Sequence, residues 1–315
     1  MKTHILDRDY HYHWNSTIPA SATVKSGDRV IFECRDCVDG QLTPESTIED
    51  FKQKDVSRLN PMIGPVFIED AEPGDVVEVE FLSLEHHGWG WAALTPTLEE
   101  SRDKPPFDND IDDLDELRIL KVGADECLEF FPNVRIPINP SVGIVGLAPA
   151  LPGSHSPTPP RRTGGNMDNR FLRSGAKVYL PVEVAGGLLS IGDGHLCQGD
   201  GQASVYAVEA PLTVTTRIRL HKDWRIDEPR YVTAPGLRHR HDAMSFYATS
   251  SFGKDLAAGV KSVQQSMVAW LQELHDLSHP DACFLTGLTG NVVVSQTSPT
   301  SDYHVSMQLP RDIFM

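Results

Sequence analysis

The stretch Ala71-Glu-Pro-Gly-Asp-Val-Val-Glu-Val-Glu-Phe81 is the clearest structural signal in the chain. Its Gly-Asp pair marks a turn, because glycine accepts unusual backbone dihedral angles and aspartate can bond its own backbone. After the turn, apolar Val77, Val79 and Phe81 alternate with Glu78 and Glu80. Side chains two apart on an extended strand share a face, so this stretch predicts a strand with one buried face and one charged face.

The same arrangement occurs at residues 22–34, where Ser-Gly-Asp precedes a second alternating segment and hints at a repeated β-unit. Further strand-like segments stand at 134–149, 178–184, 291–296 and 303–309. The 24 glycines and 23 prolines in 315 residues are typical of short strands and turns. We therefore expect a mainly β protein. Its length predicts a single unit over residues 1–315, with two β sub-domains of about 1–150 and 151–315 as the alternative.

One long amphipathic helix is predicted near the C-terminus, over Lys254–Leu277. Apolar residues recur there at spacings of three and four, from Leu256 to Leu274, and form one stripe that would pack on the core. His279-Pro280 is expected to end the helix, since proline cannot continue one.

Charge limits the classes of partner. The chain carries a net charge of −16, and its densest basic group, Arg161-Arg162 with Arg170 and Arg173, is thin. Nucleic acid and anionic membranes are therefore not expected as partners. No run of about 18 apolar residues predicts a transmembrane helix, and the N-terminus lacks the apolar segment of a secretory signal.

Cysteine usage points to no disulfide framework, because five cysteines at scattered spacings do not pair. Cys34 and Cys37 form a CxxC motif, but the second pair of a zinc ribbon is missing. The strand-like flank also differs from the strand-to-helix turn of thioredoxins. We interpret the cysteines as structural or incidental thiols in a reducing, cytoplasmic setting.

Several established motifs are absent. The chain has no Gly-x-Ser-x-Gly elbow and no Walker or dinucleotide glycine pattern ahead of a helix. The acidic run at 99–116 fails as an EF-hand, because Asp113 stands where that loop requires glycine. We interpret this run as a solvated loop.

The densest polar constellation is Gly192-Asp-Gly-His-Leu-Cys-Gln-Gly-Asp-Gly-Gln202. Asp193 and His195 are two apart, so on a strand they would project from one face. Together they could bind a divalent cation or act as acid and base. The alternative is a tight turn in which Asp193 bonds the backbone and His195 is partly buried.

Other candidate residues lie in loops or at strand ends. Asp168 follows a proline-rich loop, a common position for functional residues, and Asp36 and Asp39 follow the strand that ends near Cys34. His11 and His13 would share a strand face, but next to Trp14 they are interpreted as an aromatic edge.

A series of short motifs then resembles the acetamidase/formamidase family over about 250 residues. In chain order they are Asp36-Cys-Val-Asp-Gly-Gln41, Asn60-Pro-Met-Ile-Gly-Pro-Val66, Ala71-Glu-Pro-Gly-Asp75, Gly143-Ile-Val-Gly-Leu-Ala-Pro149, Gly164-Gly-Asn-Met-Asp168, Leu180-Pro-Val182, Gly192–Gly201, Asp281-Ala-Cys-Phe-Leu285 and Val294-Ser-Gln296. Each motif is weak alone, but their order is specific.

The resemblance implies a β-sandwich-like fold, a homo-oligomer, and an amidase that hydrolyses short linear amides such as formamide or acetamide to a carboxylate and ammonia. It also implies a divalent metal ion, zinc or calcium, as cofactor. On this basis we assign Asp36, Asp193 and His195 to the metal. Asp168 is assigned to orienting the water or the substrate NH₂ group, and His195 also counts as catalytic.

One position departs from the family pattern. The family carries glutamate after Gln-Gly-Asp-Gly, where this chain has Gln202, which cannot take a proton. Gln202 therefore belongs to the candidate catalytic set but motivates an alternative, a catalytically altered or inactive member that binds a small polar ligand. The segment 235–242 also looks unlike the family, which would alter the substrate.

Overall fold

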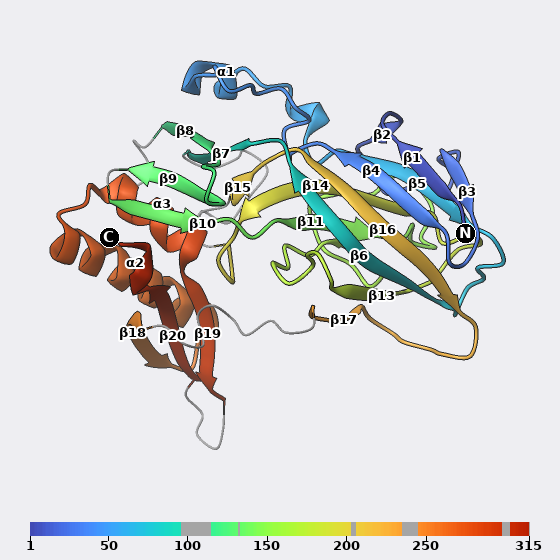
Figure 1. Cartoon of the computed structure of the whole chain (residues 1–315). Coiled ribbons are helices and arrows are strands. Elements are labelled where there is room, and N and C mark those ends of the chain that lie inside the picture. Colours follow the sequence, from blue (N-terminus) through green and yellow to red (C-terminus); the bar gives the residue numbers. More distant parts are fainter. Residues whose placement is uncertain (96–114, 132, 203–205, 235–244, 298–302, 315) are drawn as a thin grey trace.

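The computed structural model describes residues 1–95, 115–131, 133–202, 206–234, 245–297 and 303–314 (Figure 1). Two large sheets form the body, and a smaller three-stranded sheet projects from it beside the C-terminal helices. The predicted mainly β, sandwich-like class is confirmed. The acidic run at 99–116 and the segment 235–242 fall almost wholly outside the described residues.

The first large sheet has six strands. In spatial order they are β1 (Thr3–Leu6), β4 (Arg29–Cys34), β16 (Leu212–His221), β6 (Val76–His86), β13 (Lys177–Pro181) and β17 (Arg230–Val232). β1 pairs with β4 in parallel, and the other pairs are antiparallel.

The second large sheet has nine strands. Its main path is β12 (Gly164–Asn166), β11 (Ser141–Gly146), β14 (Leu189–Cys197), β15 (Val208–Glu209), β7 (Trp89–Leu94) and β8 (Glu116–Lys121). β5 (Met62–Ile68) also pairs with β14, and β2 (Tyr10–His11) and β3 (Ala22–Val24) pair with β5.

The remaining elements are short or lie near the C-terminus. A two-stranded sheet joins β9 (Cys127–Phe131) and β10 (Val134–Pro137), and the projecting sheet has the order β18 (Phe246–Gly253), β20 (Tyr303–Pro310), β19 (Asn291–Gln296). The helices are α1 (Ile48–Lys52), α2 (Leu256–His275) and α3 (His279–Thr289), with 3-10 turns at Val56–Arg58 and Arg311–Ile313.

The two Gly-Asp turns have the same construction. Gly27 and Gly74 adopt φ angles of 97° and 94°, which favour glycine. Asp28 and Asp75 each accept a hydrogen bond on their carboxylate from the backbone N–H three residues earlier, at 3.1 and 2.8 Å. Each turn leads into a strand of the six-stranded sheet, so the repeat consists of a Gly-Asp turn and the strand that follows it.

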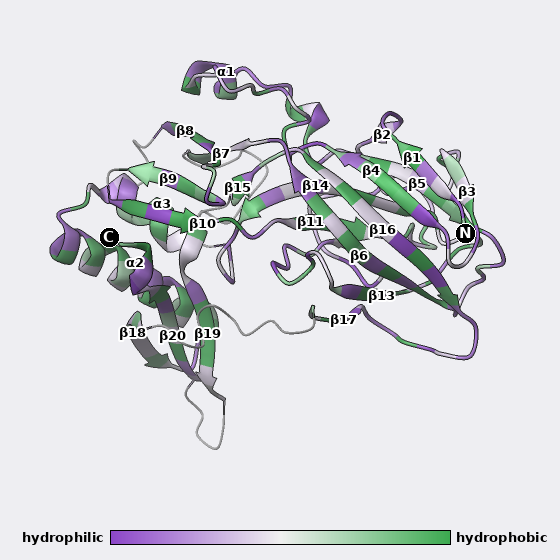
Figure 2. Ribbon diagram, in the orientation of Figure 1, coloured by the Kyte–Doolittle hydropathy of each residue, from purple (hydrophilic) through white to green (hydrophobic). Residues whose placement is uncertain are grey.

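The core lies between the two large sheets. Val77, Val79 and Phe81 of β6 are fully buried, as the alternating pattern predicts, and they belong to one apolar cluster with Ile63 and Ile191 of the other sheet. Figure 2 shows the alternation of apolar and polar bands along β6 and β16. Burial of these inner faces supplies the main stabilising free energy of the fold.

Strand β14 is buried along its whole length. Its neighbours approach so closely that a Cβ at Gly192 or Gly194 would collide with the carbonyl oxygens of Pro61 or Ala210. These glycines therefore allow the backbones to pack, and β14 carries the candidate residues Asp193 and His195 into the interior.

The long helix is confirmed as α2, but its apolar stripe is shorter than predicted. Val263, Met267 and Leu271 are fully buried, whereas Leu256 and Leu274 at the two ends are 39% and 44% exposed. The expectation that His279-Pro280 ends this helix is wrong, because α2 already ends at His275, ahead of the left-handed Asp276, and the pair instead begins a second helix. Proline suits the first turn of a helix, where its missing N–H is not needed, and Ser278 caps a second helix, α3, by accepting from Asp281 N.

Strands from before and after residue 150 alternate in both large sheets. β16 lies between β4 and β6, and β14 lies between β11 and β5. Neither half of the chain therefore completes either of the two large sheets alone. No helix among the described residues is long and apolar enough to cross a membrane.

Candidate active site

Asp193 and His195 meet inside the protein, as their spacing predicts. The Nε2 atom of His195 lies 3.3 Å from Asp193 Oδ1, and the two side chains are 0% and 5% exposed. Asp193 has a φ of 60°, so the strand is distorted there. The alternative of a tight turn is wrong, because both residues belong to β14 and Asp193 Oδ1 has no hydrogen-bond partner among the described residues.

Asp168 joins this pair from the loop after β12. One oxygen of Asp168, one of Asp193 and a ring nitrogen of His195 lie within 4.8 Å of one another. Asp168 has a φ of 44°, and its Oδ1 is buried without a hydrogen-bond partner among the described residues. The structure thus brings together three of the predicted site residues from two separate segments.

Gly143 on β11 makes the room for these three side chains. A Cβ at this position would lie 2.8 Å from Asp168 Oδ1 and 2.8 Å from His195 Cε1, and would collide with Asp193 Oδ2. Such distances are shorter than real Cβ contacts, so any side chain here would displace the cluster. The absence of a side chain at Gly143 is part of the site.

Glu209 on β15 is a site residue that the sequence analysis missed. Its Oε2 lies 3.4 Å from His195 Nε2 and has no hydrogen-bond partner among the described residues, while its Oε1 accepts from Ala207 N at 2.9 Å. The available signal was a lone carboxylate inside the otherwise apolar run 206–212. A buried charge in such a run needs a partner or a function.

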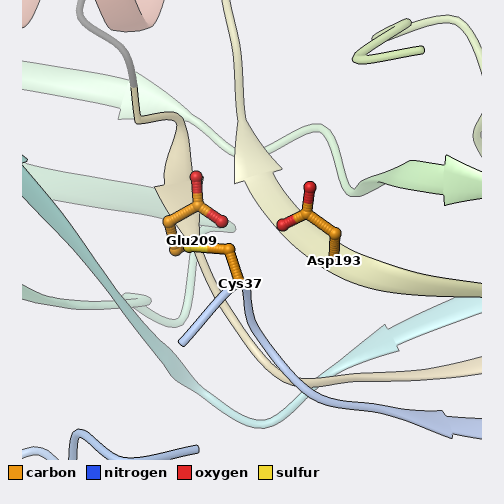
Figure 3. Close-up of side chains that lie close together, drawn as sticks. All are labelled: Cys37, Asp193 and Glu209. Atoms are coloured by element: carbon orange, nitrogen blue, oxygen red, sulfur yellow. The ribbon is translucent and has the colours of Figure 1, made fainter. Parts of the chain in front are cut away.

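Cys37, interpreted from the sequence as a structural or incidental thiol, borders the same cluster. Its sulfur and one oxygen each of Asp193 and Glu209 lie within 4.8 Å of one another. Figure 3 shows the thiol and the two carboxyl groups facing one another. The CxxC spacing gave no indication of this, because the carboxylates come from distant strands. None of the five cysteines, all within described parts of the chain, forms a disulfide.

Asp36, which was assigned to the metal, is placed differently. Its Oδ1 accepts from the backbone N–H groups of Val38 and Gly40, at 3.2 and 2.9 Å, and its Oδ2 accepts from Trp91 Nε1 at 2.8 Å. Both oxygens therefore already accept hydrogen bonds. Among the described residues, Asp36 belongs to neither of the two groups of close ligand atoms, which are Asp168 with Asp193 and His195, and Cys37 with Asp193 and Glu209. Its geometry fits a carboxylate that holds the turn carrying Cys37.

Gln198 fixes the orientation of the His195 ring. Its Oε1 lies 3.0 Å from His195 Nδ1, while its Nε2 donates to Asp168 O at 2.6 Å and to Gln202 Oε1 at 3.2 Å. Because the amide hydrogens go to two acceptors, the oxygen faces the imidazole, and Nδ1 must be the donor. The Nε2 atom therefore points toward Asp193 and Glu209 with its lone pair available in the neutral ring.

The electrostatics of the cluster are unusual. Burial raises the pKa of Asp168 to about 7, with repulsion from Asp193 adding to the effect. Burial likewise raises the pKa of Asp193 to about 6, although His195 opposes it. Burial alone would lower the pKa of His195, but Glu209 and Asp193 outweigh it and raise that pKa well above its ordinary value. The carboxyl groups of Asp193 and Glu209 therefore both interact with the imidazole of His195.

The donor set fits a divalent cation. Four buried atoms lack hydrogen-bond partners among the described residues: Asp168 Oδ1, Asp193 Oδ1, His195 Nε2 and Glu209 Oε2. No lysine or arginine of the described chain forms an ion pair with these carboxylates. The separations of 3.3 and 3.4 Å around His195 Nε2 match two ligands on a tetrahedral zinc ion, whose bonds of about 2.0–2.2 Å set ligands about 3.3–3.5 Å apart.

The remaining candidates are engaged elsewhere. Asp39 is paired with Arg35 and Arg58 and accepts from Tyr12, and Asp200 is paired with Arg170 at 2.9 Å. His11 packs edge-on against Trp14, as the aromatic-edge interpretation expects. The pairing with Asp200 engages Arg170, one member of the thin basic group named from the sequence.

The chain is similar to known proteins over most of its length. The acetamidase/formamidase family model matches residues 2–156 and 153–314. A formamidase of Methylophilus methylotrophus is 25% identical over 297 residues, covering 78% of this chain and 73% of that protein. An acetamidase of Mycolicibacterium smegmatis is 27% identical over 250 residues, covering 61% of each.

A solved γ-lactamase of Delftia acidovorans has the same fold, with a TM-score of 0.87 at 20% identity, covering 100% of this chain and 93% of that one. The family model thus spans almost all of a chain whose Asp168, Asp193 and His195 motifs meet in one buried cluster. The chain belongs to the acetamidase/formamidase family.

Proposed function

We propose that this protein hydrolyses short linear amides of the formamide and acetamide type to a carboxylate and ammonia. Its membership of an amidase family supports the reaction class. The observation that carries the proposal is the group of buried atoms on Asp168, Asp193, His195 and Glu209 that have no hydrogen-bond partner outside their contacts with one another among the described residues. A small neutral substrate suits this interior location, because a larger or charged one would need more space and more solvation.

Asp193, His195 and Glu209 are proposed to hold a divalent cation, with Glu209 in the place first assigned to Asp36. An imidazole among the ligands favours zinc or a similar ion over calcium, which prefers six to eight oxygens. When bound, such an ion would polarise the amide carbonyl and acidify a neighbouring water.

Asp168 is proposed as the proton carrier. One of its oxygens lies close to the ligand atoms of Asp193 and His195, and its Oδ1 has no hydrogen-bond partner among the described residues. Burial raises its pKa to about 7 in the metal-free site, so this carboxyl is placed to accept and return a proton. It would accept the proton of the attacking water as oxygen adds to the carbonyl carbon. It would then return that proton to the amide nitrogen as the C–N bond breaks and ammonia leaves.

Glutamine at position 202, in place of the family glutamate, does not remove the carboxyl groups that this reaction needs. Its Oε1 accepts from Gln198, a role that the family glutamate could also fill. Asp168 and Glu209 both supply carboxyl groups to the cluster. These contacts favour an active amidase over the alternative of an inactive member that binds a small polar ligand.

The test is ammonia release from formamide, acetamide and propionamide by the purified protein supplied with zinc. His195→Ala should lower turnover by about 10²–10⁴-fold, as loss of an acid–base or ligand group does. The exposed His87 provides the matched control, and His87→Ala should retain activity.

Absence of ammonia release from every short amide would refute the proposal. If Gln202→Glu then created activity in an inactive protein, the alternative of a catalytically altered member would be supported instead.

A further inference from the structure

We propose that Cys37 is a ligand of the cation in this site, as a thiolate beside Asp193, Glu209 and His195. The inference rests on the proposed cation site but not on the identity of the amide. It assigns a function to a thiol that the sequence treats as incidental, and it makes the site selective for thiophilic ions of the zinc class.

The first argument is position. The sulfur of Cys37 and one oxygen each of Asp193 and Glu209 lie within 4.8 Å of one another, and the same two carboxylates flank His195 Nε2 at 3.3 and 3.4 Å. The thiol therefore faces the same two carboxylates that flank His195 Nε2. Cys37 comes from the turn after β4, and Asp193 and Glu209 come from strands β14 and β15 (Figure 3).

The second argument is the state of the surrounding atoms. Asp193 Oδ1, Glu209 Oε2 and His195 Nε2 are buried and lack hydrogen-bond partners among the described residues. Asp193 and Glu209 are 4% and 1% exposed. Two buried carboxylates side by side repel each other, and a cation between them removes this cost.

The third argument is the support behind Cys37. Asp36 bonds the backbone N–H groups of Val38 and Gly40 and the Trp91 indole, so the turn that carries the thiol is held from both sides. Such bonding around a ligand fixes its orientation. Cys34, the other thiol of the CxxC motif, is buried in the core cluster and is in neither group of ligand atoms of the described chain.

Binding requires a simple exchange. The thiol gives its proton to solvent as the metal–sulfur bond forms, so no oxidant or reductant is involved. Sulfur ligands favour zinc, cobalt or cadmium over calcium and magnesium, which take oxygen ligands.

The experiment uses the full-length protein stripped of metal and reloaded with cobalt(II), a spectroscopic substitute for zinc. The wild-type protein should show a thiolate-to-cobalt charge-transfer band in the near-ultraviolet. Cys37→Ala should lose this band and bind zinc more weakly than wild type, by more than the about 10–100-fold typical of losing an outer-shell partner. Cys34→Ala should keep both properties.

Two results would overturn the inference. One is a wild-type cobalt spectrum without the thiolate band. The other is an unchanged spectrum and zinc affinity in Cys37→Ala, including the case in which that variant has lost turnover. Amide turnover is measured separately, so failure of the thiolate assignment can be distinguished from failure of the amidase proposal. Cys37→Ser, which keeps the side-chain volume nearly constant, separates loss of the ligand from a packing defect.

Discussion

Gln198 is the residue whose contribution is most clearly defined by its contacts. It holds His195 Nδ1 through its oxygen and is itself held by Asp168 O and Gln202 Oε1. This chain of contacts explains why glutamine at position 202 is compatible with an ordered site. The position needs an acceptor for Gln198, and both an amide and a carboxylate provide one.

We predict that Gln198→Met lowers kcat by about 10–100-fold, the usual cost of losing a partner that orients a metal-binding histidine. The apolar side chain fills the volume but leaves His195 Nδ1 without its acceptor, so in the metal-free protein, at pH values where the ring is neutral, the ring should sample both tautomers. Nitrogen NMR of labelled His195 measures the tautomer directly. Gln202→Glu is the control, since it keeps the acceptor and should preserve the single tautomer. A single Nδ1–H tautomer in Gln198→Met would contradict the role assigned to Gln198.

At the scale of the elements, the site depends on how closely β11 and β14 approach. Val142 and Ile144 of β11 pair with Gly194 and Gly192 of β14, so Gly143 stands opposite Asp193. The pairing places a position without a side chain against the one charged position of the strand.

Gly143→Ala is therefore expected to lower turnover by about 10²-fold, the scale of a 1 Å misplacement of reacting groups. The new methyl group would press on Asp168 Oδ1 and His195 Cε1, at 2.8 Å each. Ammonia release and zinc affinity should both fall. In Gly253→Ala the new Cβ has open space on β18, so that variant should behave as wild type. Normal turnover in Gly143→Ala would show that the cluster tolerates the displacement.

Away from the site, the six-stranded sheet holds a buried carboxylate of a different kind. Glu78, predicted from its alternation to face outward, is only 4% exposed and accepts from Lys177, Arg219 and His221, at 2.9 Å each. Burial would raise its pKa, but these three donors outweigh burial and lower it. Three strands, β6, β13 and β16, are tied together through this one side chain.

Glu78→Gln should lower the free energy of unfolding near neutral pH by about 1–3 kcal/mol, the scale for losing hydrogen bonds to charged groups. A carboxyl whose pKa is lowered by folding stabilises the folded protein at pH values above its pKa in the unfolded state. That stabilisation is lost as the pH falls through its pKa in the folded state. The difference between variant and wild type should therefore shrink below about pH 4.5. Denaturant titrations between pH 3 and pH 7 measure it, with exposed Glu85→Gln as control. A difference that stays constant with pH would exclude this ion-pair explanation.

At the scale of the whole molecule, the interleaving of strands decides how the chain can be divided. Both large sheets contain strands from either side of residue 150, and the site itself takes Cys37 from one half and Asp168, Asp193 and Glu209 from the other. The alternative of two separate β sub-domains would require each half to form its own core.

We predict that residues 1–150 or 151–315 expressed alone do not fold, because each half lacks the neighbours of its central strands. Amide-proton dispersion in NMR spectra measures folding of each fragment, and co-expression of the two fragments is the control that should restore a folded complex. A cooperative unfolding transition of either fragment by itself would support two sub-domains. Homo-oligomeric assembly and a cytoplasmic location stay predictions of the sequence, and sedimentation analysis of the full chain tests the first.

The sequence by itself determined the strand pattern, the long helix, the family and the meeting of Asp193 with His195. These features are local or nearly so: a period of two or of 3.6 and a spacing of two residues all act within one element. The start of α3 at His279, with Pro280 in its first turn, was also a local feature, but proline is found both in the first turn of a helix and just after the end of one.

Only the tertiary structure decided which distant residues complete the site. Glu209 and Cys37 converge on Asp193 because β15 pairs with β14 and the turn after β4 brings Cys37 next to both strands, which no spacing along the chain reveals. The sequence assigned Asp36 to the metal and treated Cys37 as incidental, yet the oxygens of Asp36 accept from the N–H groups of Val38, Gly40 and Trp91. Whether a buried carboxylate can bind a cation or only holds a backbone turn depends on which hydrogen-bond donors surround it, and some of those donors come from other strands.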